Sequence, residues 1–97
     1  MKYLIGVDVG TTATKAILYD QDATIIGHFV KGYPIYRNPQ GMAEQDPEEI
    51  VKAVKKVIRD ATNRADLNNG QLLGVAFSTA NQSVIMLDEN HQPLTRI

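Results

Sequence analysis

The spacing of apolar residues predicts three short strands at the start of the chain. Each run is rich in β-branched or other apolar residues and is bounded by Gly, Asp or Thr residues typical of turns. Connections of so few residues force neighbouring strands to run antiparallel, so residues 2–33 are expected to form a three-stranded meander. The three runs occupy residues 3–9, 14–19 and 24–30.

A helical pattern follows an irregular loop at residues 33–42, which is rich in Pro, Gly and Asn. Asp46 is the expected N-cap, Pro47 takes the first helical position, and Glu49 is expected to close a capping box. The helix is expected to end near residues 68–70 and to bury one apolar stripe on the sheet. The stripe consists of Ile50, Val54, Val57, Ile58, Ala61 and Ala65.

Residues 72–77 are almost continuously apolar, which is typical of a parallel strand covered on both faces. A right-handed crossover through the helix places this strand beside the first strand and parallel to it. Residues 84–87 are then expected to run back as a further antiparallel strand. The predicted fold class is therefore α/β: three antiparallel strands, a crossover helix, a strand parallel to the first, and a further antiparallel strand.

The composition is that of an ordinary globular domain, with 43% apolar and 22% charged residues among 97. A net charge of −1 gives no reason to expect a nucleic-acid or membrane partner. The absence of Cys excludes disulfides and cysteine chemistry and is consistent with a cytoplasmic location. The last residues, 93–97, carry no cap or turn, so we expect the chain to be the N-terminal piece of a longer protein.

The first turn carries the candidate chemistry. Alternation places Asp8 on the strand face opposite Val7, where an ionised carboxylate among apolar residues would need a partner. Gly10 lacks a Cβ and lets a ligand approach the backbone, while Thr11 and Thr12 offer hydroxyl and N–H donors. Either Asp8 caps its own turn, or the turn holds phosphates while Asp8 holds their Mg²⁺ through water. Lys15 either reaches the same anion or is a solvated strand residue.

Three segments in consistent order resemble one family. The chain is similar to the ribonuclease H-like (actin-like ATPase) half-domain of actin, hexokinases and sugar kinases, and most of all to the FGGY carbohydrate kinases. The segment 7–12 resembles their first phosphate motif, 41–47 (Gly-Met-Ala-Glu-Gln-Asp-Pro) their Gly-x-x-Glu-Gln-Asp-Pro segment, and 77–88 their sugar-side strand and turn. Residues 1–97 would then be the N-terminal part of the first FGGY kinase domain. The amino-acid sequences of these segments most resemble those of gluconate kinases, with xylulose kinases next.

The resemblance implies an enzyme that transfers phosphate from ATP to a hydroxyl of a sugar or sugar acid, with gluconate favoured over xylulose and other sugars. It implies that Asp8 helps to hold Mg²⁺, that Gly10, Thr11 and Thr12 hold ATP phosphates, and that Asn81 and Gln82 contact the sugar. Many relatives have Met-His in place of these last two residues.

The family's catalytic Asp and adenine site lie in segments absent here, so residues 1–97 are expected to show no turnover by themselves. The expected partners are a small sugar or sugar acid and the remainder of the same polypeptide, and a homodimer of the full-length protein is left open. Two rival classes also remain open. A non-catalytic sugar sensor or actin-like module needs only the phosphate turn, whereas a ribonuclease H-like nuclease needs more carboxylates beside Asp8.

Overall fold

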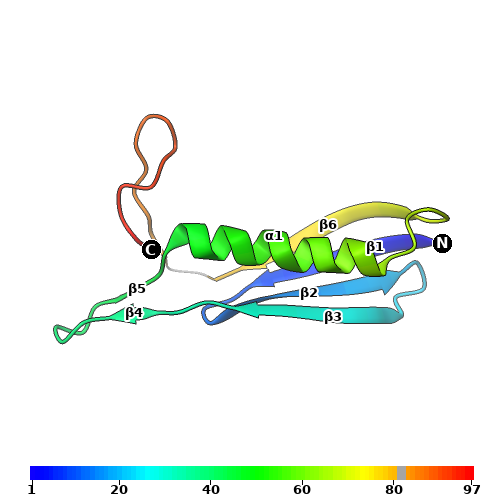
Figure 1. Ribbon diagram of the computed structural model, residues 1–97, viewed down its shortest axis with the longest axis horizontal. Helices are drawn as coiled ribbons and strands as arrows, with labels where there is room; N and C mark the ends of the chain where they lie inside the picture. Colours follow the sequence, from blue (N-terminus) through cyan, green and yellow to red (C-terminus); the bar gives the residue numbers. More distant parts are fainter. Residues whose placement is uncertain (81–82) are drawn as a thin grey trace.

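One helix packs on one face of a four-stranded sheet, in a computed structural model that describes residues 1–80 and 83–97 (Figure 1). The strand order in the sheet is β3-β2-β1-β6, and β4 and β5 form a separate two-stranded hairpin. The elements are β1 (Lys2–Val9), β2 (Ala13–Asp20), β3 (Ile25–Gly32), β4 (Tyr36–Arg37), β5 (Ala43–Glu44), α1 (Pro47–Arg64) and β6 (Gln71–Thr79).

The predicted meander is confirmed: β1 pairs antiparallel with β2, and β2 with β3. Asp20 fixes the second reversal, because its Oδ1 accepts hydrogen bonds from the N–H groups of Asp22 at 2.9 Å and Thr24 at 3.0 Å. The alternation in β1 is also confirmed, since Ile5 and Val7 are buried while Asp8 lies on the opposite face. The register of the first two strands therefore follows from their apolar pattern.

Helix α1 begins as predicted, with the Asp46 side chain accepting from the N–H of Glu48. The predicted capping box is wrong: the Glu49 carboxylate accepts a hydrogen bond from the Tyr36 hydroxyl in the hairpin. The helix also ends earlier than expected, at Arg64, where the N–H of Ala65 still donates to the Ala61 carbonyl. The Glu49 side chain therefore bonds to a residue distant in sequence, Tyr36, instead of to the backbone at the helix start.

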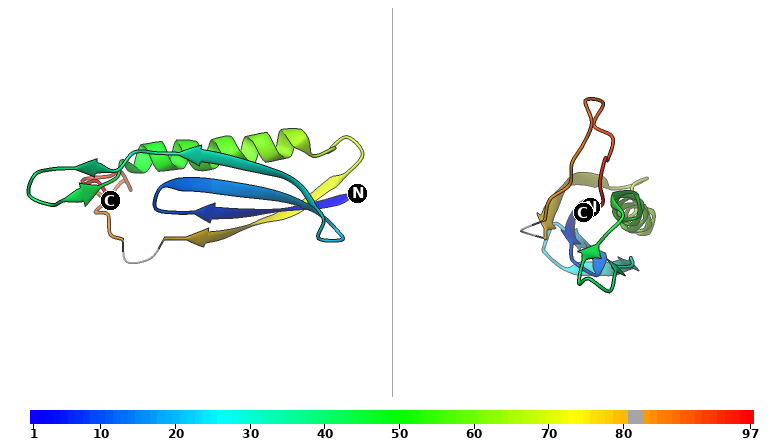
Figure 2. Two further views of the ribbon diagram at one scale, coloured as in Figure 1. Left: turned by 90° about the horizontal axis from the view of Figure 1, so that it is seen from below. Right: turned by 90° about the vertical axis from the view of Figure 1, so that its left-hand side faces the viewer.

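The core lies between α1 and one face of the sheet. The buried helix residues are Ala53, Val57 and Ala61, so the stripe is centred on small side chains and includes Ala53, which the apolar pattern did not single out. Small residues allow the helix axis to approach the strands closely, and Val57 fills the space between them. The sheet side of this core consists of Tyr3, Ile5, Val7, Ala16 and Leu18. The other face of the sheet carries no second layer of described residues (Figure 2).

Strand β6 lies beside β1 and parallel to it, which confirms the crossover. The expectation that it is covered on both faces is wrong, because β6 is an edge strand of a sheet with one helix layer. Leu73 is 52% exposed and Phe77 is 56% exposed. The continuous apolar run shows that β6 has apolar side chains on both faces. The described residues cover only one of these faces.

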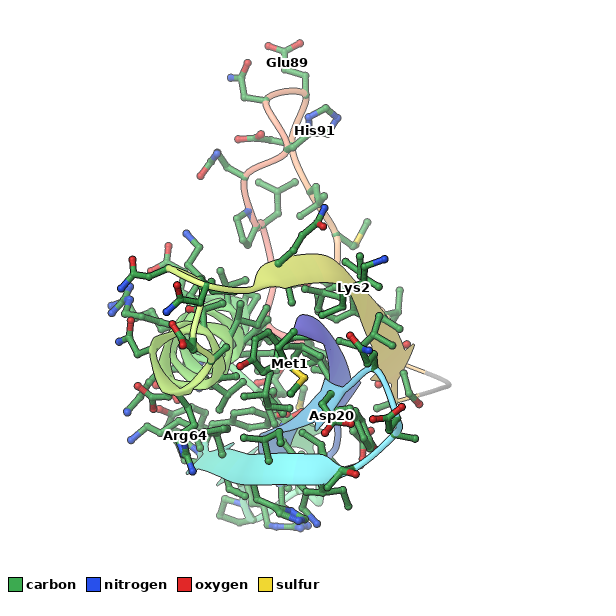
Figure 3. The ribbon with its side chains drawn as sticks, turned by 90° about the vertical axis from the view of Figure 1, so that its right-hand side faces the viewer. Met1, Lys2, Asp20, Arg64, Glu89 and His91 are labelled. Atoms are coloured by element: carbon green, nitrogen blue, oxygen red, sulfur yellow. The ribbon has the colours of Figure 1, made fainter. Side chains whose placement is uncertain are left out.

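The described residues of 83–87 contribute no strand to the sheet, so the predicted further antiparallel strand is wrong. Their backbone groups pair within the C-terminal segment instead: the N–H of Leu94 donates to Met86 O at 2.7 Å, and that of Asp88 to Gln92 O at 2.8 Å. This segment forms a loop that protrudes from the sheet, with Glu89 and His91 near its tip (Figure 3). The described ranges include no helix whose length and hydropathy suit a membrane span.

Candidate functional site

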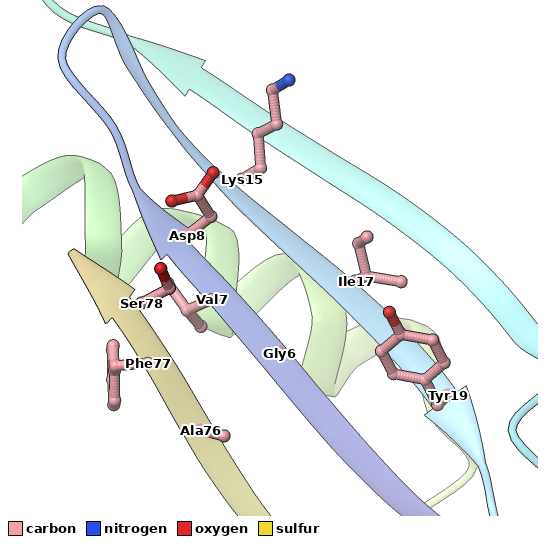
Figure 4. A pocket seen from close by; sticks show the side chains of 9 residues that line it. All are labelled: Gly6, Val7, Asp8, Lys15, Ile17, Tyr19, Ala76, Phe77 and Ser78. Carbon is pink, nitrogen blue, oxygen red and sulfur yellow. The ribbon is translucent and has the colours of Figure 1, made fainter. Parts of the chain in front are cut away.

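Three polar side chains form a row across the open face of the sheet. The strand registers place Asp8 of β1 opposite Lys15 of β2 on one side and opposite Ser78 of β6 on the other. All three are exposed, and their side chains project from the sheet face that α1 does not cover (Figure 4). They line a shallow pocket of about 380 Å³, together with Gly6, Tyr19 and Phe77.

The Asp8 carboxylate is open to solvent, contrary to the expectation from its apolar neighbours in sequence. Because Asp8 is exposed, its charge needs no buried partner. The self-capping alternative is not observed either, since the Gly10 N–H donates to the Ala13 carbonyl at 2.9 Å and not to Asp8. Within the described ranges the carboxylate accepts no hydrogen bond and forms no ion pair with Lys15. It is therefore available to a ligand.

The turn after β1 is held by contacts to its carbonyl oxygens. The Tyr33 hydroxyl donates to Gly10 O, and the Tyr33 N–H donates to Thr12 O at 3.2 Å. The side-chain amide of Gln45 donates to Thr11 O at 2.6 Å. All three carbonyls of the turn are thus occupied by protein donors.

Thr11 and Thr12 supply the donors of the turn that no described residue uses. Thr11 and Thr12 are exposed, and their N–H groups have no acceptor among residues 1–80 and 83–97. Backbone N–H groups and hydroxyls that point outward from a tight turn are the groups that bind phosphate oxygens. Gly10 has little room for a side chain, because a Cβ there would lie 3.0 Å from the Ala13 carbonyl oxygen.

Tyr33 and Gln45 are the residues that sequence reasoning missed. They lie 23 and 34 positions away from the carbonyls they contact, so no local pattern connects them to the turn. Tyr33 belongs to the loop at residues 33–42, for which the sequence predicts only irregular structure. Gln45 lies within the Glu-Gln-Asp-Pro segment, so the motif marked its position without indicating its contact.

A second hollow, which we call the Arg37 hollow, lies beyond the end of the same turn. It has a volume of about 350 Å³ and shares Thr11 and Gln45 with the turn. Its other lining residues include Ile35, Arg37, Ser83 and Val84. The turn therefore lines the hollow beside the β4–β5 hairpin through Thr11, whereas the pocket on the open sheet face is lined by the strands that the turn connects. Asn81 and Gln82, the predicted sugar contacts, lie outside the described residues.

A polar cluster fixes the hairpin against the start of α1. The hydrogen bond to Glu49 raises the pKa of the Tyr36 hydroxyl above its ordinary value, with lost hydration acting in the same direction. The Arg96 guanidinium lies 4.2 Å from the centre of the Tyr36 ring. Gln45 and Ile97 exchange two backbone hydrogen bonds of 2.9 Å. These contacts anchor one wall of the Arg37 hollow.

The described residues contain no group of three or more His, Asp or Glu side chains arranged to hold a metal. A metal at Asp8 would therefore take one carboxylate from this part of the chain. This donor set fits Mg²⁺, which commonly keeps several waters and binds one or two carboxylates together with substrate phosphates.

Comparison with known proteins identifies the class. Residues 3–97 match the N-terminal domain of the FGGY family of carbohydrate kinases, and the chain belongs to this family. A gluconokinase of Bacillus subtilis (strain 168) is 39% identical over 93 residues, which cover 96% of this chain and 18% of the relative.

Solved structures confirm the fold. A gluconate kinase from Lactobacillus acidophilus matches with a TM-score of 0.91 and 40% identity, over 98% of this chain and 19% of that one. A ligand-bound xylulose kinase from Lactobacillus acidophilus matches with a TM-score of 0.92 and 40% identity, over 99% of this chain and 19% of that one. The present chain thus spans about a fifth of the length of these relatives. The ribonuclease H-like α/β half-domain predicted from the sequence is the fold of this family's N-terminal region.

Proposed function

We propose that residues 1–97 are the N-terminal part of the first domain of an ATP-dependent kinase that phosphorylates a hydroxyl of a sugar or sugar acid, with gluconate as the favoured substrate. The observation that carries the proposal is the turn at residues 10–12. Its carbonyl oxygens are bound by Tyr33 and Gln45, the N–H groups of Thr11 and Thr12 have no acceptor among the described residues, and the open Asp8 carboxylate lies on the adjacent strand.

Each predicted site residue has a role that its chemistry supports. Thr11 and Thr12 bind ATP phosphate oxygens through backbone N–H and hydroxyl groups. Gly10, whose N–H is used on Ala13 O, lets the phosphates come close to the backbone because it has no Cβ. Asp8 would hold Mg²⁺, in part through water, and the bound ion would supply positive charge to the phosphates. Lys15, opposite Asp8 in the strand register, supplies a positive charge to the same phosphates. Asn81 and Gln82 contact the hydroxyls of the acceptor.

The reaction needs parts that this segment does not supply. A sugar hydroxyl attacks the γ-phosphorus, its proton passes to a base, and ADP leaves. We expect the base and the adenine site in the remainder of the same polypeptide, and therefore no turnover by residues 1–97 alone. A cytoplasmic location suits an enzyme that consumes ATP.

The test is a coupled ADP-release assay of the full-length protein with gluconate and with xylulose, at saturating Mg²⁺ and ATP. We expect turnover with gluconate, and a fall in kcat of about 100-fold or more in Asp8→Asn, because the loss of the metal-binding charge removes transition-state stabilisation. Asp22→Asn in the β2–β3 turn is the matched control and should retain wild-type kinetics. Wild-type kinetics in Asp8→Asn would overturn the site, and failure to phosphorylate either sugar would instead favour a non-catalytic sensor.

A further inference from the structure

The Arg37 hollow is lined by a cation that has no ion-pair partner among the described residues. Arg37 is exposed at the end of β4, and its guanidinium forms no ion pair with any carboxylate in residues 1–80 and 83–97. Its backbone is fixed by the pairing with Ala43 in the β4–β5 hairpin. The hairpin is in turn anchored to α1 through Tyr36 and Glu49. Within the part of the chain that the structure describes, Arg37 is thus an unpaired positive charge on an anchored hairpin, at the edge of a hollow.

The remaining lining suits a polyhydroxylated ligand. Thr11 and Ser83 contribute hydroxyls, and Gln45 retains its amide oxygen as an acceptor after its Nε2 is used on Thr11 O. Ile35 and Val84 add apolar surface. The volume of about 350 Å³ falls within the range of about 300 to 1,000 Å³ typical of small-molecule sites. The hollow adjoins the turn that would hold the phosphates, so an acceptor bound there lies next to ATP.

Charge distinguishes the two candidate acceptors. Gluconate carries a carboxylate and xylulose does not, whereas both present several hydroxyls. A planar guanidinium binds a carboxylate through two parallel hydrogen bonds, which are stronger than bonds between neutral groups. Lys15 is not placed for this role, because it lies on the open face in the row with Asp8 and does not line the Arg37 hollow.

We propose that Arg37 is the residue that selects a sugar acid, by binding the acceptor's carboxylate in the Arg37 hollow. The inference rests on the proposed kinase function and deepens it by naming the acceptor class as aldonates. Without the guanidinium, a carboxylate in this hollow would lose its ionic partner, while a neutral sugar would lose little.

The experiment compares full-length wild type, Arg37→Gln and Arg37→Lys with gluconate and with xylulose at saturating Mg²⁺ and ATP. We expect Arg37→Gln to lower kcat/KM for gluconate by about 10- to 100-fold, mainly through KM, and for xylulose by less than about threefold. Arg37→Lys should recover part of the loss because it restores the charge without the bidentate geometry. Arg59→Gln on α1 is the matched control and should leave both substrates unaffected, and an unchanged KM for ATP verifies that the variants keep the phosphate turn.

The outcomes separate this inference from the proposed function. Wild type that phosphorylates xylulose but not gluconate would overturn the inference and leave the kinase function standing. Equal losses with both sugars in Arg37→Gln, or no loss with gluconate, would do the same. Wild type that phosphorylates neither sugar would remove the proposed function, and the inference with it.

Discussion

Tyr33 contacts the turn at residues 10–12 through both its side chain and its backbone. Its hydroxyl donates to Gly10 O and accepts from the Thr14 hydroxyl at 3.3 Å, while its N–H donates to Thr12 O. Both contacts bind carbonyl oxygens on the protein side of the turn. They stabilise the conformation in which the N–H groups of Thr11 and Thr12 remain free for an anion. Tyr33 thus holds two of the three carbonyl groups of the turn, and Gln45 holds the third.

Replacing Tyr33 with Phe tests this dependence, because it removes the hydroxyl and keeps the ring and the backbone N–H. In the full-length protein we expect KM for ATP to rise by about 3- to 10-fold, as expected for the loss of one hydrogen bond, with a smaller change in kcat. Tyr3→Phe is the matched control: it removes the hydroxyl that accepts from the Asp66 N–H at 3.3 Å, far along the sheet from the turn. Initial-rate kinetics with varied ATP measure both, and equal KM values in the two variants would contradict the role of Tyr33.

At the scale of residues, the sequence predicts the turn at residues 10–12 but not the contacts from Tyr33 and Gln45 that hold it. Asp8, Gly10, Thr11 and Thr12 place a carboxylate, a bare backbone and hydrogen-bond donors within five positions, and that local chemistry is visible in the sequence itself. The prediction that the Asp8 carboxylate needs a partner among apolar residues is wrong, because Asp8 is exposed and its burial depends on whether a second layer covers that face. Tyr33 and Gln45 could not be assigned to the turn, because their contacts exist only after the loop has crossed back over it.

At the scale of helices and strands, two predictions that depend on neighbouring residues are confirmed, and two that depend on distant contacts are wrong. The alternation in β1 and the Asp46 cap of α1 are determined by neighbouring residues, and both predictions are confirmed. The capping box at Glu49 and the strand at 84–87 depend on competing partners elsewhere in the chain, and both predictions are wrong. The sequence pattern of a helix or strand limits which side chains it can bury and which hydrogen bonds it can form. Contacts with the rest of the structure determine which of these form.

The junction of α1 and β6 depends on a glycine. A Cβ on Gly70 would lie 2.6 Å from the Asp66 carbonyl oxygen and 2.7 Å from that of Met1, both backbone atoms. The Met1 carbonyl also accepts from the Gln71 N–H at 2.9 Å, so any shift there disturbs the bond that joins the starts of β1 and β6.

We therefore expect Gly70→Ala to lower the free energy of unfolding of the full-length protein by about 1 to 3 kcal/mol, the usual cost of overpacking. Gly32→Ala is the control, because the added methyl would meet its nearest atom, Thr12 O, at an ordinary 3.6 Å. It should change the stability by less than about 0.5 kcal/mol. Urea unfolding measures both variants, and equal midpoints would show that the junction relaxes without cost.

At the scale of the whole molecule, the described residues cover only one face of the sheet. The molecule measures 51 × 29 × 20 Å, with α1 along one side of the sheet and no described layer on the other. Leu4 is 44% exposed on the open face and lines a hollow with Tyr19, Gly74 and Ala76. Apolar surface of this kind is where we expect later segments of the same polypeptide to pack, given that the relatives are about five times longer.

Leu4→Ser tests this expectation by giving opposite results in two contexts. If later segments bury Leu4, the full-length protein should lose about 1.5 to 3 kcal/mol of stability, the value of a buried Leu side chain. Residues 1–97 expressed alone should instead aggregate less, because the substitution reduces exposed apolar surface. Val51→Ser is the control, since Val51 is 50% exposed on α1 and not on the open face. Thermal unfolding and light scattering measure the two effects. A full-length Leu4→Ser variant as stable as the wild type would mean that nothing packs on this face, and that the rest of the polypeptide contacts the segment elsewhere.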